Sequence, residues 1–335
     1  MLILNIYLKS IILYIYSYYF YIYKTMEEYK EIIDWYKSTL IFKLSQIGYA
    51  LNCNLIFSDR LEKIEIDKSF QLIKFLKDGD KIFMDLGAIK FIERLNNIVN
   101  AIKSLNIKLI FYLQYEPNVP NDIINLLLPL SYHIYSQNNN FSHQLVHCMP
   151  IGIRDCGTIA KSMHDNFYHS YLFNEGLKTI SKKYLCLIGG VGDTHPDRLI
   201  SYKCLKDKSF VYDISKFIFP FNMTSRYGRV PIYKYYEYIN QSSYVITPSG
   251  AGVDTHRFFE VIYLKSIPIV KKTNTVFDKL YDIFPCLIIN DWNDITEELL
   301  NSNLSILKSK INDFFQKYPD CYFNNNVLDD LLLTT

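Results

Sequence analysis

Residues that could bind an anion and a sugar are concentrated in one stretch, residues 244–272. Gly250 and Gly252 follow a short apolar run, and Arg257 and Glu260 lie three residues apart, so they would share one side of a helix. Glycines let the backbone turn tightly and approach a ligand closely, and a guanidinium can hold a phosphate through two parallel hydrogen bonds. The Glu260 carboxylate can accept hydrogen bonds from sugar hydroxyls. These residue types indicate a site for a ligand with phosphate and hydroxyl groups.

The elements expected to position these side chains are a strand, a glycine loop, a helix and a second strand. Tyr244–Ile246 is a short aromatic and β-branched run typical of a buried parallel strand, and Ile267–Val270 is the next such run. Asp254 is expected to be the N-cap of the helix between them. Such a βαβ unit points backbone N–H groups and the positive end of a helix dipole beyond the first strand, which makes an anion site.

The same residues have an interpretation that needs no ligand. Arg257 and Glu260 could form a surface pair worth a few tenths of a kcal/mol, on the order of 0.2–0.5 kcal/mol, and the two glycines could serve only the turn. His256 could contact a phosphate or be an ordinary histidine of the helix surface or core. A Gly-x-Gly pattern alone is a weak indicator of phosphate binding, so the residue pattern leaves both interpretations open.

A resemblance to a known family favours the ligand site. The string Pro-Ser-Gly-Ala-Gly-Val-Asp-Thr-His-Arg-Phe-Phe-Glu at 248–260, followed by Lys-Ser-Ile-Pro-Ile-Val at 265–270, resembles the donor-binding segment of exostosin-like glycosyltransferases. Relatives read roughly Pro-Arg-Gly-x-Gly-x-Asp-x-x-Arg-x-x-Glu. The matching positions are Gly250, Gly252, Asp254, Arg257, Glu260 and Pro268. The chain departs at Ser249, where an arginine is common, and at Ser266, near a frequent glycine.

The resemblance implies an α/β fold of the GT-B class, with two Rossmann-like doubly wound parallel-sheet domains facing a cleft. It implies a nucleotide-sugar donor, a glycan or glycoprotein acceptor, an inverting and metal-independent reaction, and no cofactor. Arg257 would stabilise charge on the diphosphate leaving group. The donor-binding residues would be Gly190, Arg198, Ser249, Gly250, Ala251, Gly252, Asp254, His256, Arg257 and Glu260.

Strand and helix patterns alternate along the chain, which predicts parallel sheets. We expect an apolar N-terminal segment at 1–25, an acceptor domain at 26–160, a linker helix at 161–180 and a donor-binding domain at 181–322. A second strand–glycine loop–helix unit spans 184–205 and carries Gly190 and Arg198. It lacks the full Gly-x-Gly-x-x-Gly fingerprint of dinucleotide-binding domains, so NAD binding ranks below nucleotide-sugar binding.

Several elements are predicted in detail. The patterns predict helices at 26–52, 89–105 and 165–180, and a strand at 184–188. A further helix has Pro231 at its first position. The last long helix runs from Ile295 to Tyr318, with a break near Asn301–Asn303.

Glycosyl transfer also needs a base that takes the proton of the acceptor hydroxyl. Glu116, Asp85 and Asp155 each follow an apolar run of the N-terminal half, where strand ends would face the cleft. We favour Glu116 slightly, because it lies between Tyr115 and Pro117 at the end of a predicted strand. Each carboxylate could equally be a helix cap or a loop residue. We interpret no Asp-x-Asp triad of the sequence as a metal site.

Composition excludes several classes of protein. The 335 residues carry a net charge of +2, so no strong basic field argues for nucleic acid as a partner. Seven scattered cysteines without a Cys-x-x-Cys pair indicate reduced, mostly buried thiols and not a disulfide framework or a zinc site. With 49% hydrophobic and 21% charged residues, the chain is globular.

Residues 1–23 are almost wholly apolar or aromatic. They could form a signal-anchor in a secretory-pathway membrane, a translated stretch upstream of a start at Met26, or a packed N-terminal element. A small-residue cleavage site is not evident, which disfavours a removed signal peptide. Membrane attachment depends on this segment alone, so the sequence leaves cytoplasmic and membrane locations open.

Two other functions stay open. A different Rossmann enzyme would bind NAD(P) or S-adenosylmethionine, and neither fingerprint is intact. A catalytically weak or inactive relative of the transferases would bind nucleotide-sugar or glycan without turnover, and Ser249 in place of a common arginine keeps this hypothesis open.

Overall fold

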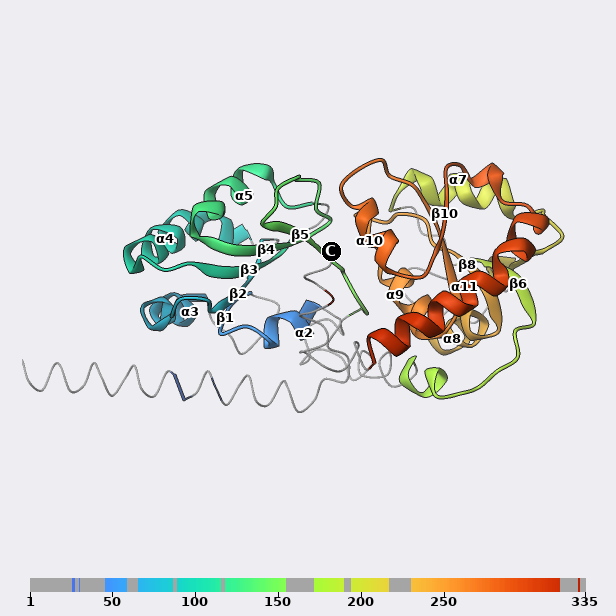
Figure 1. Cartoon of the computed structure of the whole chain (residues 1–335), viewed down its shortest axis with the longest axis horizontal. Coiled ribbons are helices and arrows are strands. Elements are labelled where there is room, and N and C mark those ends of the chain that lie inside the picture. Colours follow the sequence, from blue (N-terminus) through green and yellow to red (C-terminus); the bar gives the residue numbers. More distant parts are fainter. Residues whose placement is uncertain are drawn as a thin grey trace, which may run out of the picture.

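The computed structural model shows two parallel sheets, each with its own helices, side by side along the long axis of the molecule (Figure 1). It describes residues 26–27, 30, 46–58, 66–86, 89–115, 118–154, 172–189, 194–216, 230–319 and 331. Predictions that fall on 1–25, Glu116, Asp155, Gly190 and residues 165–171 lie outside these residues. Of the helix predicted over 165–180, residues 172–176 are helical and 177–180 are not, so this helix ends earlier than predicted. Within the described part of the chain, none of the helices has the length and apolar character needed to cross a membrane.

The first sheet has five parallel strands in the order β1-β2-β3-β4-β5. They are β1 (Leu55–Phe57), β2 (Lys81–Asp85), β3 (Leu109–Gln114), β4 (Ser131–Gln137) and β5 (Val146–Met149). The α-helices around them are α2 (Gln46–Leu51), α3 (Ile66–Leu72), α4 (Ile89–Leu105) and α5 (Asn121–Leu127), with short 3-10 helices at Ile73–Phe75 and Leu128–Leu130.

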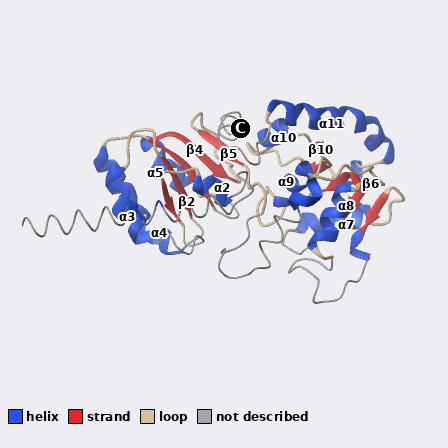
Figure 2. Ribbon diagram, turned by 90° about the horizontal axis from the view of Figure 1, so that it is seen from below, coloured by secondary structure: helices blue, strands red, loops and turns tan. Residues whose placement is uncertain are grey.

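Alternate residues of these strands face opposite sides, as the period of two requires. Ile82 and Met84 of β2 pack into the core under α4 and α5, whereas Phe83 between them packs with Tyr49 of α2. Helix α2 therefore covers one face of the sheet, and α3, α4 and α5 cover the other (Figure 2). Both faces are buried, which explains why β1, β2 and β3 read as nearly continuous apolar runs.

The second sheet also has five parallel strands, in the order β10-β9-β8-β6-β7. They are β6 (Tyr184–Ile188), β7 (Val211–Asp213), β8 (Ser242–Ile246), β9 (Ile267–Lys271) and β10 (Leu287–Ile289). Its helices are α7 (Pro196–Leu205), α8 (Ile232–Asn240), α9 (His256–Tyr263), α10 (Asp278–Ile283) and α11 (Glu297–Lys317), with 3-10 turns at Ile214–Lys216 and Trp292–Asp294. Residues 172–176 are also helical.

The strand order reverses between β6 and β8, so this sheet is doubly wound. At such a switch point the loops after two neighbouring strands diverge to opposite faces and leave a crevice, where open α/β sheets bind ligands. Helices α7 and α11 pack on one face and α8, α9 and α10 on the other. The described strands of the first sheet run in sequential order instead, with no reversal. Two parallel α/β sheets arranged in this way confirm the predicted GT-B fold class.

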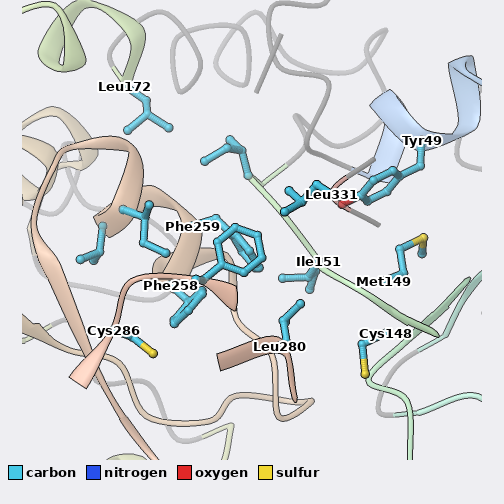
Figure 3. Close-up of a cluster of buried hydrophobic side chains, with 14 of the residues drawn as sticks. Tyr49, Cys148, Met149, Ile151, Leu172, Phe258, Phe259, Leu280, Cys286 and Leu331 are labelled. Carbon is cyan, nitrogen blue, oxygen red and sulfur yellow. The ribbon is translucent and has the colours of Figure 1, made fainter. Parts of the chain in front are cut away.

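One hydrophobic cluster joins the two halves of the molecule. It contains Tyr49 and Met149 from the first half and Phe258 and Leu280 from the second, and Ile151 lies between the two groups (Figure 3). All five side chains are buried, Ile151 to 4% exposure. The segment that leaves β5 therefore packs directly against the helix that follows the glycine loop.

Local predictions can be compared with these elements. The helix over 89–105 and the strand over 184–188 are confirmed. The break expected near Asn301–Asn303 is wrong, because α11 is continuous and the Asn303 amide bonds the Leu299 carbonyl of its own helix at 2.9 Å. Pro231 is the N-cap of α8 and not its first residue. Of the helix predicted over 26–52, the described residues 26–27, 30 and 46–51 are helical, the last of these forming α2.

Candidate functional site

A pocket of about 330 Å³ opens at the carboxyl ends of β6 and β8, the switch point of the second sheet. The loop and helix after β6, the loop and helix after β8, and helix α8 with the residues before it form most of its wall. The segment after β5 completes the wall from the first half. The lining residues are Ile151, Arg154, Thr194, Arg198, Val230, Ile232, Tyr235, Tyr236, Gly250, Ala251, Gly252, Asp254, Thr255, His256, Arg257 and Glu260.

Arg198 lies across the glycine loop. It is placed by the first turn of α7, which His195 caps by accepting a hydrogen bond from the Asp197 N–H. Its Nε donates to the Ser249 carbonyl at 3.0 Å, and its Nη2 is 2.7 Å from where a Cβ on Gly250 would be. Burial, together with the nearby charge of Arg257, lowers the pKa of Arg198 to about 10. The guanidinium is therefore still charged at neutral pH.

Arg257 supplies a second positive charge from the first turn of α9. Its Nη1 is 3.5 Å from the Ile246 carbonyl at the end of β8, and its guanidinium lies 5.5 Å from the centre of the Tyr235 ring. A cation over an aromatic face is attracted by the ring quadrupole. Two guanidinium groups on one wall repel each other, and an anion between them would relieve that repulsion.

Glu260 is buried, at 6% exposure, one turn further along α9. Its Oε1 accepts a hydrogen bond from the Tyr236 hydroxyl at 3.1 Å. Burial raises the pKa of Glu260, while the Tyr236 hydrogen bond and the charges of Arg257 and Arg154 act in the opposite direction. The carboxyl group is thus held in one orientation beside two guanidinium groups.

His256 is tied to the first half of the chain. Its Nδ1 lies 2.9 Å from the Gly152 carbonyl. Because a carbonyl oxygen only accepts, Nδ1 must carry the hydrogen, and in the neutral ring the lone pair is then on Nε2. This backbone contact fixes the tautomer of a histidine that lines the pocket.

Asp254 does not cap α9 as expected, since Thr255 occupies the N-cap position. The Asp254 side chain, at 3% exposure, accepts from the Ile151 N–H at 2.6 Å and from the Thr255 N–H at 2.9 Å. Burial raises the pKa of Asp254 to about 8. The cause of the wrong prediction is a contact with a residue more than a hundred positions away, which the local pattern could not reveal.

The loop offers fewer backbone donors to a ligand than expected. The Gly250 N–H bonds the Gly252 carbonyl at 2.9 Å, the Asp254 N–H bonds Asn138 Oδ1 at 2.9 Å, and the Thr255 N–H bonds the Asp254 side chain. Three of the N–H groups that could have faced an anion are therefore used within the protein. The positive character of the pocket depends mainly on its arginines.

Most of the predicted donor-binding residues come together at this pocket. Arg198, Gly250, Ala251, Gly252, Asp254, His256, Arg257 and Glu260 line it. Ser249 does not line it and contributes its carbonyl to Arg198 instead. Gly190 lies outside the described residues.

Of the three predicted bases, the structure describes Asp85. Asp85 is fully buried at the end of β2, apart from the pocket, and accepts a hydrogen bond from the Ser58 hydroxyl at 3.3 Å. An acceptor hydroxyl would have to come within hydrogen-bond reach of a base, so the structure argues against Asp85. Glu116 and Asp155 are not among the described residues.

Arg154, Tyr235 and Tyr236 also line the pocket and were not predicted from the sequence. Arg154 follows β5 in the segment that crosses to the second half. The Tyr-rich face of α8 could have indicated Tyr236, had its hydrogen bond to Glu260 been known. Within the described ranges, no three histidine, cysteine, aspartate or glutamate side chains gather as metal ligands.

No protein-family model matches the chain, and no curated protein matches it. Among solved structures, an α,α-trehalose-phosphate synthase (UDP-forming) from Burkholderia vietnamiensis is similar, with 9% identity, a TM-score of 0.40, and coverage of 78% of this chain and 73% of that one. MurG from Acinetobacter baumannii has 13% identity, a TM-score of 0.36 and coverage of 80% and 77%. A trehalose-6-phosphate protein from E. coli, bound with UDP-2-fluoro glucose, has 10% identity, a TM-score of 0.37 and coverage of 87% and 82%.

At these identities and TM-scores, the similarities assign no activity and no ligand to this chain. The class of protein follows from the two sheets and the pocket at the switch point, which define a two-domain α/β protein of the GT-B class.

Proposed function

We propose that this protein is a glycosyltransferase of the exostosin-like type, which moves a sugar from a nucleotide-sugar donor to a glycan or glycoprotein acceptor. The observation that carries the proposal is the convergence of Arg198, Arg257 and Glu260 on one pocket at the switch point. Two guanidinium groups suit a diphosphate, and a buried, oriented carboxylate suits the hydroxyls of a ribose.

In the proposed reaction the acceptor hydroxyl attacks the anomeric carbon of the donor sugar while the bond from that carbon to the diphosphate oxygen breaks. The electron pair of the broken bond leaves with the nucleoside diphosphate, and the acceptor proton passes to a base. Arg198 and Arg257 would stabilise the charge that develops on the leaving group. A single displacement of this kind inverts the anomeric centre.

Arg198 would also compensate for the departure at Ser249. The resemblance leads us to expect a guanidinium at position 249, beside the donor phosphates. Here the Ser249 backbone carbonyl holds the guanidinium of Arg198 at that loop, and Gly250 leaves room for it. Helix α7 would thus supply the charge that relatives often place in the loop itself.

The reaction is proposed to need no metal and no cofactor, because fixed guanidinium charges can take the place of a divalent ion at the diphosphate. Glu116 remains our preferred base. A base on the first half of the chain would come from the same half as Arg154, which lines the pocket.

A second proposal is a catalytically weak relative that binds the nucleotide-sugar without turnover. The burial of Asp85, one of the two preferred bases, favours this alternative. Donor binding without transfer would distinguish it from the first proposal.

The test is a turnover assay with the full chain. Nucleoside diphosphate release from UDP-, GDP- and CMP-linked sugars (nucleoside monophosphate for the last) is measured with and without a mixture of oligosaccharide acceptors. Acceptor-dependent release that is lost in Arg257→Ala is the expected result. Donor binding with no release under any condition would favour the weak relative, and binding of only NAD or S-adenosylmethionine would contradict both.

A further inference from the structure

Gly252 was expected to let the backbone approach a ligand, but a protein side chain occupies the space beside it. A Cβ at this position would overlap the side-chain amide of Asn138, with its Cγ at 2.7 Å and Oδ1 at 2.8 Å. Asn138 comes from the first half of the chain, directly after β4. The absence of a side chain at 252 therefore serves a contact between the two halves of the molecule.

Asn138 is built into this contact. Its backbone has a φ of 49°, a left-handed conformation that asparagine tolerates better than most residues. The side chain is 4% exposed, and its Oδ1 accepts from the Asp254 N–H at 2.9 Å. Its buried Nδ2 finds no hydrogen-bond partner in the described structure. Burying an unpaired amide nitrogen is costly, so the bond to Asp254 and the fit against Gly252 must hold the side chain in place.

Two more contacts reach the same loop from the end of β5, the neighbour of β4. The Ile151 N–H donates to Asp254 Oδ2 at 2.6 Å, and the Gly152 carbonyl accepts from His256 at 2.9 Å. Because Gln137 and Met149 are paired in register, the two strands end together at this edge. Asp254 is thus held through its backbone by one strand end and through its side chain by the other.

We infer that Asn138 and Asp254 are positioning residues which fasten the glycine loop 250–254 to the first half of the chain, so that the anion site is complete only when the two halves are engaged. Neither residue needs to touch the reacting atoms. The loop lines the pocket, Arg198 packs against it at Gly250, and Asn138 packs against it at Gly252 and Asp254. The inference depends on the proposed function only for the identity of the ligand.

The first test needs no ligand. Amide hydrogen exchange is followed in the full chain for the peptide that contains Asp254. Asn138→Gly removes the Oδ1 that accepts from the Asp254 N–H, so this amide should lose protection at least tenfold. Glycine accommodates the φ of 49° without strain, so the loss would not come from the backbone at 138. Asn106→Gly is the matched control, because Asn106 also has a positive φ, 52°, but is an exposed residue after α4. Unchanged protection in Asn138→Gly would overturn the inference.

The second test is a double-mutant cycle on pyrophosphate affinity, measured by calorimetry. Gly252 has no positive φ, so Gly252→Ala meets only the steric conflict with Asn138. The single Gly252→Ala change should weaken binding roughly tenfold, and the same change in an Asn138→Gly background should weaken it less than twofold further. Equal losses in both backgrounds would mean that the ligand itself needs the glycine, and would overturn the inference.

The two tests separate the two proposals. Should the wild-type protein bind no pyrophosphate, the proposed function fails, and the exchange experiment still decides the role of Asn138. Gly252→Ala provides a second disruption of the same contact if Asn138→Gly does not fold, and it too should expose the Asp254 amide to exchange. If the role of these residues were only structural, the variants would lower the melting temperature, but the changes at 138 and 252 would show no coupling in pyrophosphate affinity.

Discussion

The guanidinium of Arg198 is fastened to the backbone carbonyl of Ser249 at 3.0 Å, so a side chain from α7 lies over the loop that follows β8. The two elements belong to the strands on either side of the switch point. This bond therefore links the two βα units that form the pocket, and it puts a charged group where an anion would enter the crevice.

Replacing Arg198 tests the charge at this position. Arg198→Ala should weaken pyrophosphate and nucleotide binding about 10- to 100-fold, since hydrogen bonds to charged groups are worth about 1.5–3 kcal/mol. Arg198→Lys should recover part of the loss, because lysine keeps the charge without the planar fork. Lys203→Ala is the control, as Lys203 is exposed on the same helix. Binding unchanged in Arg198→Ala, measured by calorimetry, would exclude Arg198 from the site.

Gly250 and Gly189 should differ sharply when each is changed to alanine. At Gly250 the new methyl group meets the far end of the long Arg198 side chain, which can shift, so stability should change by less than about 1 kcal/mol while anion affinity falls. At Gly189, with a φ of 151°, it meets the buried Ile214 side chain, so unfolding free energy should drop by about 2 kcal/mol or more. Urea unfolding measures the free energy of unfolding of each variant, and calorimetry measures its anion affinity. Equal stability losses would contradict this account of the loop.

The fold was largely predictable, because each element's signal is local. The α4 helix and the β6 strand depend on residues within one continuous run, and their predicted bounds are those observed. The glycine loop and Arg257 were found for the same reason. Asp254 was misjudged because its partner, Ile151, is distant in sequence. Arg154 was missed because its place in the pocket depends on how the two halves pack, which no short pattern encodes.

Glu260 is expected to distinguish ribose from 2′-deoxyribose. A buried carboxylate that binds a hydroxyl rejects an analogue that lacks it, so a ribonucleoside diphosphate should bind at least tenfold more tightly than its 2′-deoxy form. Glu260→Ala should remove this preference. Tyr236→Phe, which removes the hydroxyl that orients Glu260 at 3.1 Å, should reduce it only in part. Competition titrations with both nucleotides measure the ratio, and a preference retained in Glu260→Ala would count against the role.

Asp254 should make stability depend on pH. Burial raises its pKa to about 8, whereas an unfolded aspartate has a pKa of about 3.9. The native state therefore holds a proton that the unfolded chain has released. The contribution of Asp254 to stability is fully present below about pH 4 and is lost as pH rises towards 8. One such group contributes a slope of up to about −1.4 kcal/mol per pH unit.

Asp254→Asn should flatten that slope between pH 5 and 8, at the expense of lower stability overall. The pKa of Glu260 is raised in the same direction, so a smaller slope should remain. Asp207→Asn is the control, because Asp207 has an exposed side chain at 82%. Urea unfolding at several pH values gives the free energies, and the same slope in Asp254→Asn as in the wild type would refute the assignment.

The most direct test of the central claim is a thermal-shift panel on the full chain and on Arg257→Ala. The ligands are UDP-, GDP- and CMP-sugars, NAD and S-adenosylmethionine. A donor at about 100 times its dissociation constant adds about 2.7 kcal/mol of stability, and each kcal/mol raises the melting temperature on the order of 2–4 °C for domains of this size. We predict a shift with one class of nucleotide-sugar that disappears in Arg257→Ala. A shift with NAD or S-adenosylmethionine alone, or an undiminished shift in Arg257→Ala, would contradict the account.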